Sequence, residues 1–331
     1  MTQERIGELM VTGETILYAL FPILIAHVTK IMPPILFGGL STLTAGIALF
    51  VYMVFKKEVR KLMNWRAIKY AIGITVFIII IPSILIFTGS SKTSGVNTTI
   101  LLQSEIFFTL VICGIFTDEK VTTKKVIGAI TMVGGTLLIL LNGNFKINIG
   151  DILIIAGTFF YPIGNIFAKK ALTFSPPSVI LFIRSIFGGI VLLLISWQFE
   201  THDLSISQII SNNYLFILAN GILIYAISKI FWYESIKRID ISKSILISVG
   251  AYPAISLLFA FLFLREIPTV SQIGGLIIIL VGIFQIIERK SGEFSIRIGS
   301  HPRALDEQLL LHPIRAFLPH GGYFLSKEQY Q

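Results

Sequence analysis

The feature that most constrains this chain is a series of long apolar segments separated by short polar connections. A helix needs about 20 apolar residues to cross the ~30 Å hydrocarbon core of a bilayer. Ten segments approach this length, and no connection between them is long enough for a soluble domain. The predicted spans are residues 10–29, 34–55, 66–88, 94–116, 124–142, 150–171, 177–198, 213–236, 242–264 and 270–288. We therefore predict an all-α membrane protein with ten transmembrane helices.

The composition agrees with lipid as the main solvent. Hydrophobic residues make up 54% of the 331 residues and charged residues only 14%, which is too little charge to cover a soluble domain of this size. The net charge of +9 does not indicate a nucleic-acid partner, because most Lys and Arg flank the apolar segments. The five histidines are dispersed and the single cysteine, Cys113, lies in an apolar run, so we expect no metal site and no cofactor.

The distribution of Lys and Arg predicts the direction of the spans. The connections after the second, fourth, sixth and eighth spans carry most of the positive charge. The alternate connections contain only Lys30, Lys92, Lys146 and Arg265. Because positively charged loops stay in the cytoplasm, both termini are predicted to be cytoplasmic. We expect residues 1–9 to be a cytoplasmic N-terminus without a cleavable signal peptide, and residues 289–331 to be a cytoplasmic, disordered tail.

The chain also repeats itself. Glu119 and Glu266 are 147 positions apart, and glycines follow each of them after nine and sixteen residues. These glycines are Gly128 and Gly135 in the first half and Gly275 and Gly282 in the second. Self-similarity at this scale indicates a duplication, and we place the two halves at residues 10–143 and 150–288. Five spans in each half is an odd number, so the copies are predicted to be inverted, with a polar cleft where they meet.

The repeat markers carry structural predictions of their own. The paired glycines are expected to allow close helix packing, and Glu119 and Glu266 to cap the helices that follow them. Gly150 and Asp151 open the second half, and Arg184 comes early in the seventh span. A span that closes on Glu and is followed by a Gly-containing span completes the pattern. It resembles the EamA-type members of the drug/metabolite transporter superfamily, which implies export or exchange of a small metabolite across the cell (inner) membrane.

Charged side chains inside the spans are the first candidates for a functional site. A charge in lipid costs at least a few kcal/mol, so it should face a cavity or a partner. Glu105, Arg184 and Lys229 lie about 16, 12 and 10 Å deep at 1.5 Å per residue, which fits one shared aqueous cavity. Structural alternatives remain open: Glu105 could neutralise either cation in a buried pair, and both cations could reach the cytoplasmic interface.

Helical spacing adds further candidates in the eighth span. Gly221, Tyr225, Ser228, Lys229 and Trp232 fall on one face of it. On this face the aromatic rings would stack on an organic substrate, and the ammonium group would attract an anionic one.

Three polar residues in other spans complete the candidate site. Thr98 shares a face of the fourth span with Glu105. Tyr252 and Asn165 are candidate cavity groups, although a kink at Pro253 and an interhelical hydrogen bond explain them equally well.

These features predict a secondary transporter, an exporter or exchanger, that moves a small organic metabolite by alternating access. The sequence has no G-x-x-x-x-G-K-[ST], so protons or a counter-substrate would supply the energy in place of ATP. Glu105 is the candidate proton carrier, because a carboxyl group removed from water can exchange a proton at working pH. A channel or membrane scaffold is the alternative. An enzyme is disfavoured, because the one histidine in a span, His27, has no catalytic partner there.

Overall fold

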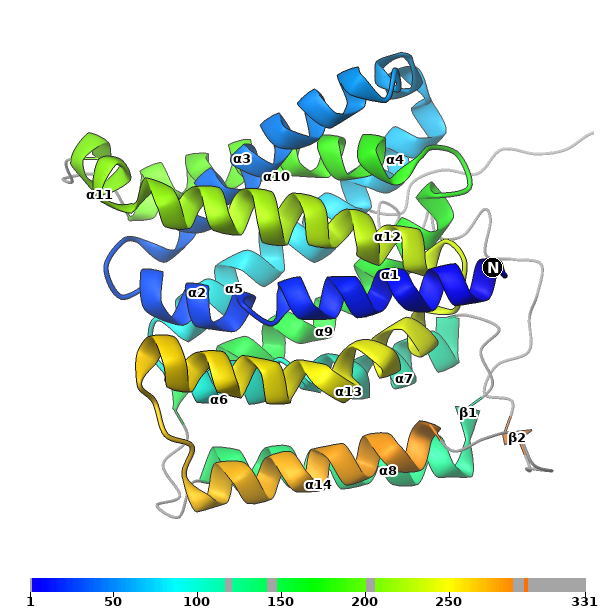
Figure 1. The fold of residues 1–331 in the computed structure, drawn as a ribbon, viewed down its shortest axis with the longest axis vertical. Helices are drawn as coiled ribbons and strands as arrows, with labels where there is room; N and C mark the ends of the chain where they lie inside the picture. The colour runs from blue at the N-terminus through cyan, green and yellow to red at the C-terminus, as the bar shows by residue number, and fades with distance from the viewer. Residues whose placement is uncertain (1, 117–120, 142–147, 201–205, 288–294, 297–331) are drawn as a thin grey trace, which may run out of the picture. The chain divides into compact units, whose positions relative to one another are not determined.

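The structure is a computed structural model that describes residues 2–116, 121–141, 148–200, 206–287 and 295–296. These residues are almost entirely helical (Figure 1). The helices of the first half are α1 (Gln3–Tyr18), α2 (Phe21–Val28), α3 (Pro34–Phe55), η1 (Val59–Met63), α4 (Trp65–Ile74), η2 (Thr75–Ile80), α5 (Ile81–Ser90), α6 (Gly95–Leu101), α7 (Ser104–Phe116) and α8 (Thr123–Leu141). Those of the second half are α9 (Ile149–Ala171), α10 (Pro177–Phe199), α11 (Ile206–Leu218), η3 (Ala219–Ser228), α12 (Lys229–Ile236), α13 (Ile241–Phe259), η4 (Ala260–Leu264) and α14 (Val270–Ile287).

Seven helical segments in the described part of the chain are long and apolar enough to cross a membrane. They are Gln3–Val28, Pro34–Phe55, Trp65–Ser90, Gly95–Phe116, Ile149–Ala171, Pro177–Phe199 and Ile206–Ile236. Three shorter apolar segments are Val126–Leu138, Ile255–Leu264 and Val270–Gly282. The predicted helical class is therefore confirmed, while the number of ten transmembrane helices stays a prediction.

Two two-residue strands are the exception to this helical structure. β1 (Val121–Thr122) pairs with β2 (Ser295–Ile296) in antiparallel register. β2 belongs to the segment predicted to be a disordered tail, and that prediction stays a prediction. The rest of the tail and Glu119 lie outside the described residues.

Several predicted spans are not continuous α-helices. Pro22 has no N–H to donate, and the first span breaks into α1 and α2 just before it. The π-helical turn η2 ends next to Pro82, which likewise removes an α-helical hydrogen bond. In the fourth span, Gln103, Glu105 and Ile106 each bond to the carbonyl three residues back, so this part of the span is overwound between α6 and α7.

The most extensive helix pairings join equivalent segments of the two halves. α3 packs along α10, and α8 packs along α14, side by side in Figure 1. A methyl group at Gly135 would lie 2.6 Å from the carbonyl oxygen of Gly275, and one at Gly282 would lie 2.6 Å from that of Gly128. The prediction that the paired glycines serve close packing is thus confirmed. A side chain at either position would push two backbones apart.

This contact predicts a large difference between two neighbouring glycines. Gly135→Ala should destabilise the protein by about 1–3 kcal/mol, because the clash is with backbone that cannot rotate away. Gly134 has no atom within 4 Å of an added methyl group, so Gly134→Ala should be neutral or stabilise α8 by up to about 1 kcal/mol. Thermal unfolding of the two purified variants in detergent measures the difference. Equal melting temperatures would contradict the packing argument.

Glu266 caps a helix of the other half, so the predicted cap on the following helix is wrong. Its carboxylate accepts from the backbone N–H of Gly95 (3.2 Å) and of Val96 (2.9 Å), at the start of α6. The following helix, α14, has a capping box of its own: Gln272 Oε1 accepts from Thr269 N, and Thr269 Oγ1 accepts from Gln272 N.

Glu200, at the end of α10, makes the same kind of contact between the halves. Its carboxylate accepts from the backbone N–H groups of Ile35 and Leu36 at the start of α3, both at 2.9 Å. A carboxylate is favoured there because helix N-termini carry unpaired N–H donors and a partial positive charge. Two carboxylates of the second half therefore cap the N-termini of two helices of the first half.

Candidate functional site

A cavity lies between the two halves. Its empty volume is about 840 Å³, a figure that includes open solvent at its mouth. The first half contributes α1, η2, α7 and the turn before α7, and the second half contributes α9, α10, η3, α12 and α13. The lining residues are Glu14, Tyr18, Ile78, Ile79, Leu102, Gln103, Glu105, Ile106, Tyr161, Asn165, Arg184, Tyr225, Lys229, Trp232, Tyr233, Ile245, Ser248 and Tyr252.

The cavity brings together most of the residues that the sequence nominated. Those that line it are Glu105, Asn165, Arg184, Tyr225, Lys229, Trp232 and Tyr252. Gly221, from the same predicted face as Tyr225, packs against α3 instead: a methyl group there would lie 2.7 Å from the Ser41 carbonyl oxygen. The π-helical winding of η3 changes the spacing on which that face was predicted.

Thr98 does not line the cavity. Its hydroxyl donates to the Ser94 carbonyl (2.9 Å) and lies 3.1 Å from the Ser90 hydroxyl on α5. The predicted shared face assumed one continuous α-helix from Thr98 to Glu105, whereas the chain overwinds between them. Thr98 consequently belongs to the contact between α5 and α6.

The ammonium group of Lys229 has a partner that the sequence analysis did not consider. Lys229 Nζ lies 2.7 Å from Glu14 Oε1, and the side chain of Glu14 is only 2% exposed. The ammonium also lies over the ring of Tyr18, 3.4 Å from its centroid. The Ser248 hydroxyl donates to the second Glu14 oxygen at 3.4 Å. This pair joins α1 to α12, and α13 lies beside it.

Glu14 could have been found from the sequence. It lies within the predicted first span, residues 10–29, where the rule applied to Glu105 also applies: a carboxylate in lipid needs a cavity or a partner. The alternative in which Glu105 neutralises Lys229 is not what the structure shows, because Glu14 takes that place.

Glu105 faces the cavity without an ion pair among the described residues. The amide nitrogen of Asn165 lies 3.5 Å from Glu105 Oε1, and the Asn165 carbonyl oxygen accepts from Trp232 Nε1 at 3.1 Å. Because the indole donates to the amide oxygen, the amide NH₂ is turned toward Glu105. A carboxylate with one weak donor keeps most of its capacity for a proton or a substrate cation.

Arg184 is a buried cation with unused donors. It is 2% exposed, and its Nη1 donates to the Tyr233 hydroxyl at 3.1 Å. Its Nε has no hydrogen-bond partner in the described part of the chain. Leaving a donor of a charged group unpaired in a buried site is costly, so a ligand anion in the cavity would stabilise it.

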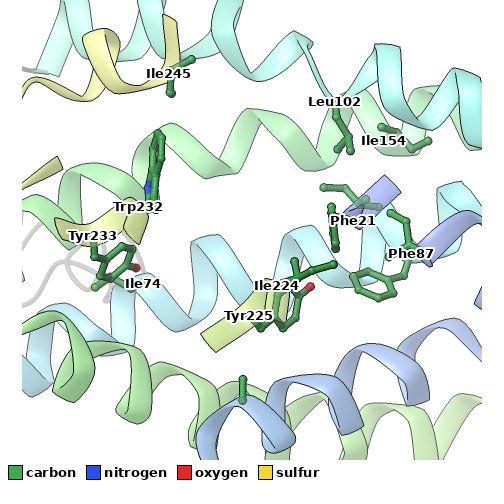
Figure 2. Packing of buried hydrophobic residues seen from close by; sticks show 14 of the residues in the cluster. Phe21, Ile74, Phe87, Leu102, Ile154, Ile224, Tyr225, Trp232, Tyr233 and Ile245 are labelled. Atoms are coloured by element: carbon green, nitrogen blue, oxygen red, sulfur yellow. The ribbon is translucent and has the colours of Figure 1, made fainter. Parts of the chain in front are cut away.

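A cluster of aromatic side chains lies next to the cavity. Tyr18 and Tyr225, which line the cavity, lie next to Phe21, with ring centroids 5.0 and 6.0 Å from it. Phe21 in turn lies 5.9 Å from Phe87, and Phe37 lies 5.8 Å from Phe87. Figure 2 shows Phe21 and Phe87 close together beside Tyr225. Phe21, Phe37 and Phe87 are essentially unexposed, and they lie toward the end where α3 begins and α5 finishes.

Comparison with known proteins identifies relatives. The uncharacterized transporter YoaV of Bacillus subtilis is 24% identical over 262 residues, covering 76% of this chain and 87% of the relative. An uncharacterized transporter of Methanothermobacter thermautotrophicus is 26% identical over 302 residues, covering 84% and 85%. A probable amino-acid metabolite efflux pump of Salmonella typhimurium is 25% identical over 267 residues, covering 76% and 85%.

A solved crystal structure shares the fold. Its TM-score is 0.64 at 18% sequence identity, and the match covers 85% of this chain and 96% of that one. Two stretches of the sequence, residues 5–141 and 148–287, each match the EamA-like transporter family. The chain therefore belongs to the EamA-like transporter family and contains its membrane domain twice.

Proposed function

We propose that this protein is a secondary transporter that moves a small zwitterionic metabolite by alternating access through the cavity between its halves. It would have ten transmembrane helices, five in each of two inverted halves at residues 10–143 and 150–288. Arg184 carries the proposal: it is a buried cation that lines the cavity, and its Nε has no hydrogen-bond partner in the described part of the chain.

The contacts between helices support a two-fold relation between the halves, as inverted repeats require. α5, in the third span of the first half, packs on α9, and α12, in the third span of the second half, packs on α1. The fourth spans follow the same rule, since α7 packs on α9 and α13 packs on α1. Replacing each helix by its equivalent in the other half therefore gives the same set of helix contacts. A two-fold relation of this kind gives the inward- and outward-open states similar energies.

The proposed orientation makes this an inward-facing or occluded form. With both termini in the cytoplasm, the starts of α3 and α6 lie at the outer side, where Glu200 and Glu266 hold them. The cluster of Phe21, Phe37 and Phe87 lies between that side and the cavity. Opening to the outside would have to break these contacts and make equivalent ones near the cytoplasm.

The charges of the cavity favour a zwitterion. Arg184 offers free donors to a carboxylate, and Glu105 offers acceptor oxygens to an ammonium group. Tyr161, Trp232 and Tyr252 supply aromatic surface for an apolar side chain. The name of the Salmonella relative, a probable amino-acid metabolite efflux pump, supports an amino-acid-like substrate. We also propose that Glu105 couples transport to protons, or that a counter-substrate takes this role in exchange.

Flux into liposomes with a panel of amino acids tests the proposal. Saturable uptake with counterflow is expected, whereas unsaturable conductance would support the channel alternative and contradict alternating access. Arg184→Gln should weaken the binding of an α-amino acid by about 10–100-fold, because one or two charge-assisted hydrogen bonds to its carboxylate are lost. The binding of an amine that lacks the carboxylate should not change. Arg5→Gln removes an exposed charge outside the cavity and should change neither. If Arg184→Gln lost affinity equally for the amino acid and for the amine, this result would contradict recognition of the carboxylate by Arg184.

A further inference from the structure

The strongest surface charge in the described chain lies between α3 and α4. Residues 55–69, here called the basic rim, contain one acidic residue, Glu58. The basic residues of the rim are Lys56, Lys57, Arg60, Lys61, Arg66 and Lys69, and all six are exposed. Glu58 is already engaged, because it accepts a hydrogen bond from Ser178 and pairs with Lys61 at 3.2 Å.

The basic rim has a defined shape. α3 ends where Lys57 adopts a left-handed backbone, with φ of 56°. The chain then runs as η1, whose Val59 and Leu62 turn inward and pack on a buried apolar cluster. Asn64 caps α4 and donates to the Phe174 carbonyl at 2.9 Å. These contacts hold the cations in place against the bundle.

Large apolar side chains are interleaved with these cations and point outward. Phe55 is 82% exposed, Met63 87% and Trp65 63%. Phe55 ends one apolar span and Trp65 begins the next, so all three lie at the boundary between hydrocarbon and headgroups. Cations next to outward apolar groups at this depth match a lipid: its phosphate meets the cations, and its upper acyl chain meets Phe55 and Met63.

We infer that the basic rim binds the headgroups of anionic phospholipids. The occupant is a lipid because an acidic soluble protein would leave the exposed apolar residues without a partner. This inference rests on the proposal that α3 and α4 cross the membrane, and it is independent of the substrate and of the direction of transport.

Native mass spectrometry of the full chain in detergent tests the inference, with phosphatidylglycerol and phosphatidylcholine offered in equal amounts. The protein should retain phosphatidylglycerol about tenfold more strongly. Lys56→Gln/Arg60→Gln should remove most of that preference, since each cation near an anionic lipid contributes up to roughly a factor of five. Lys30→Gln/Lys92→Gln removes the same charge from exposed sites in other connections and should leave the preference within about twofold.

Three results would overturn the inference: no preference for phosphatidylglycerol, an equal loss in both double variants, or retention of a polyglutamate peptide in place of the lipid. Melting temperatures equal to that of the parent protein show that both variants are folded. Liposome flux is a separate measurement. A protein that prefers phosphatidylglycerol but moves no amino acid contradicts the proposed function alone, and a transporter without the preference contradicts the lipid site alone.

Discussion

Glu105→Gln is expected to abolish proton-driven accumulation of substrate while exchange of substrate across the membrane continues. Glutamine has the same shape as glutamate and can keep the contact with Asn165, but it cannot exchange a proton. Because Glu105 has no ion pair in the described structure, its replacement breaks no salt bridge. The expected loss is therefore one of coupling, and folding should be preserved.

The measurement compares uptake with and without an imposed pH gradient in liposomes. The parent protein should accumulate substrate when the gradient is present, and Glu105→Gln should only equilibrate it. Glu234→Gln is a matched control, because this carboxylate pairs with Arg238 and does not line the cavity. Gradient-driven accumulation by Glu105→Gln would exclude Glu105 as the proton carrier. Glutamine keeps one acceptor oxygen for the substrate ammonium group, so loss of exchange as well would show that binding needs the full charge of the carboxylate.

Lys229→Met is expected to be the most destabilising single change in the cavity. It leaves the carboxylate of Glu14, 2% exposed, without its cation at 2.7 Å. Breaking one side of a buried ion pair typically costs about 3–5 kcal/mol, because the remaining charge stays removed from water. Glu14→Gln/Lys229→Met removes both charges and should recover most of that loss.

A double-mutant cycle on melting temperature tests this pairing. The coupling between positions 14 and 229 should be about 2 kcal/mol or more, whereas Glu105→Gln and Lys229→Met, whose charges interact without forming an ion pair, should couple more weakly. Additivity at 14 and 229 would contradict a structural pair. The pairing also bears on recognition: an ammonium group already neutralised by Glu14 is a weaker attractant for a substrate anion than Arg184.

Much of the fold follows from the sequence because lipid imposes simple rules on it. Apolar length sets where helices cross, and most predicted spans agree with the observed helices within a few residues. Larger differences occur where polar contacts extend a helix. α1 begins at Gln3, seven residues before the predicted start, with Thr2 as its N-cap, and its Glu4 and Glu8 pair with Lys243. The repeated glycines also predicted close helix packing, and they lie where the backbones of two helices come into contact.

The sequence was enough to predict the membrane class, the duplication and seven of the eighteen residues that line the cavity, because charged and aromatic residues inside apolar spans must face a cavity or a partner. The partners of these residues can be seen only in the packed structure. Lys229 pairs with Glu14 across 215 positions, Glu266 caps α6 of the other half, and Thr98 lies outside the cavity. Such contacts depend on how helices break and which faces meet. These are properties of the packed halves together, and no single segment encodes them.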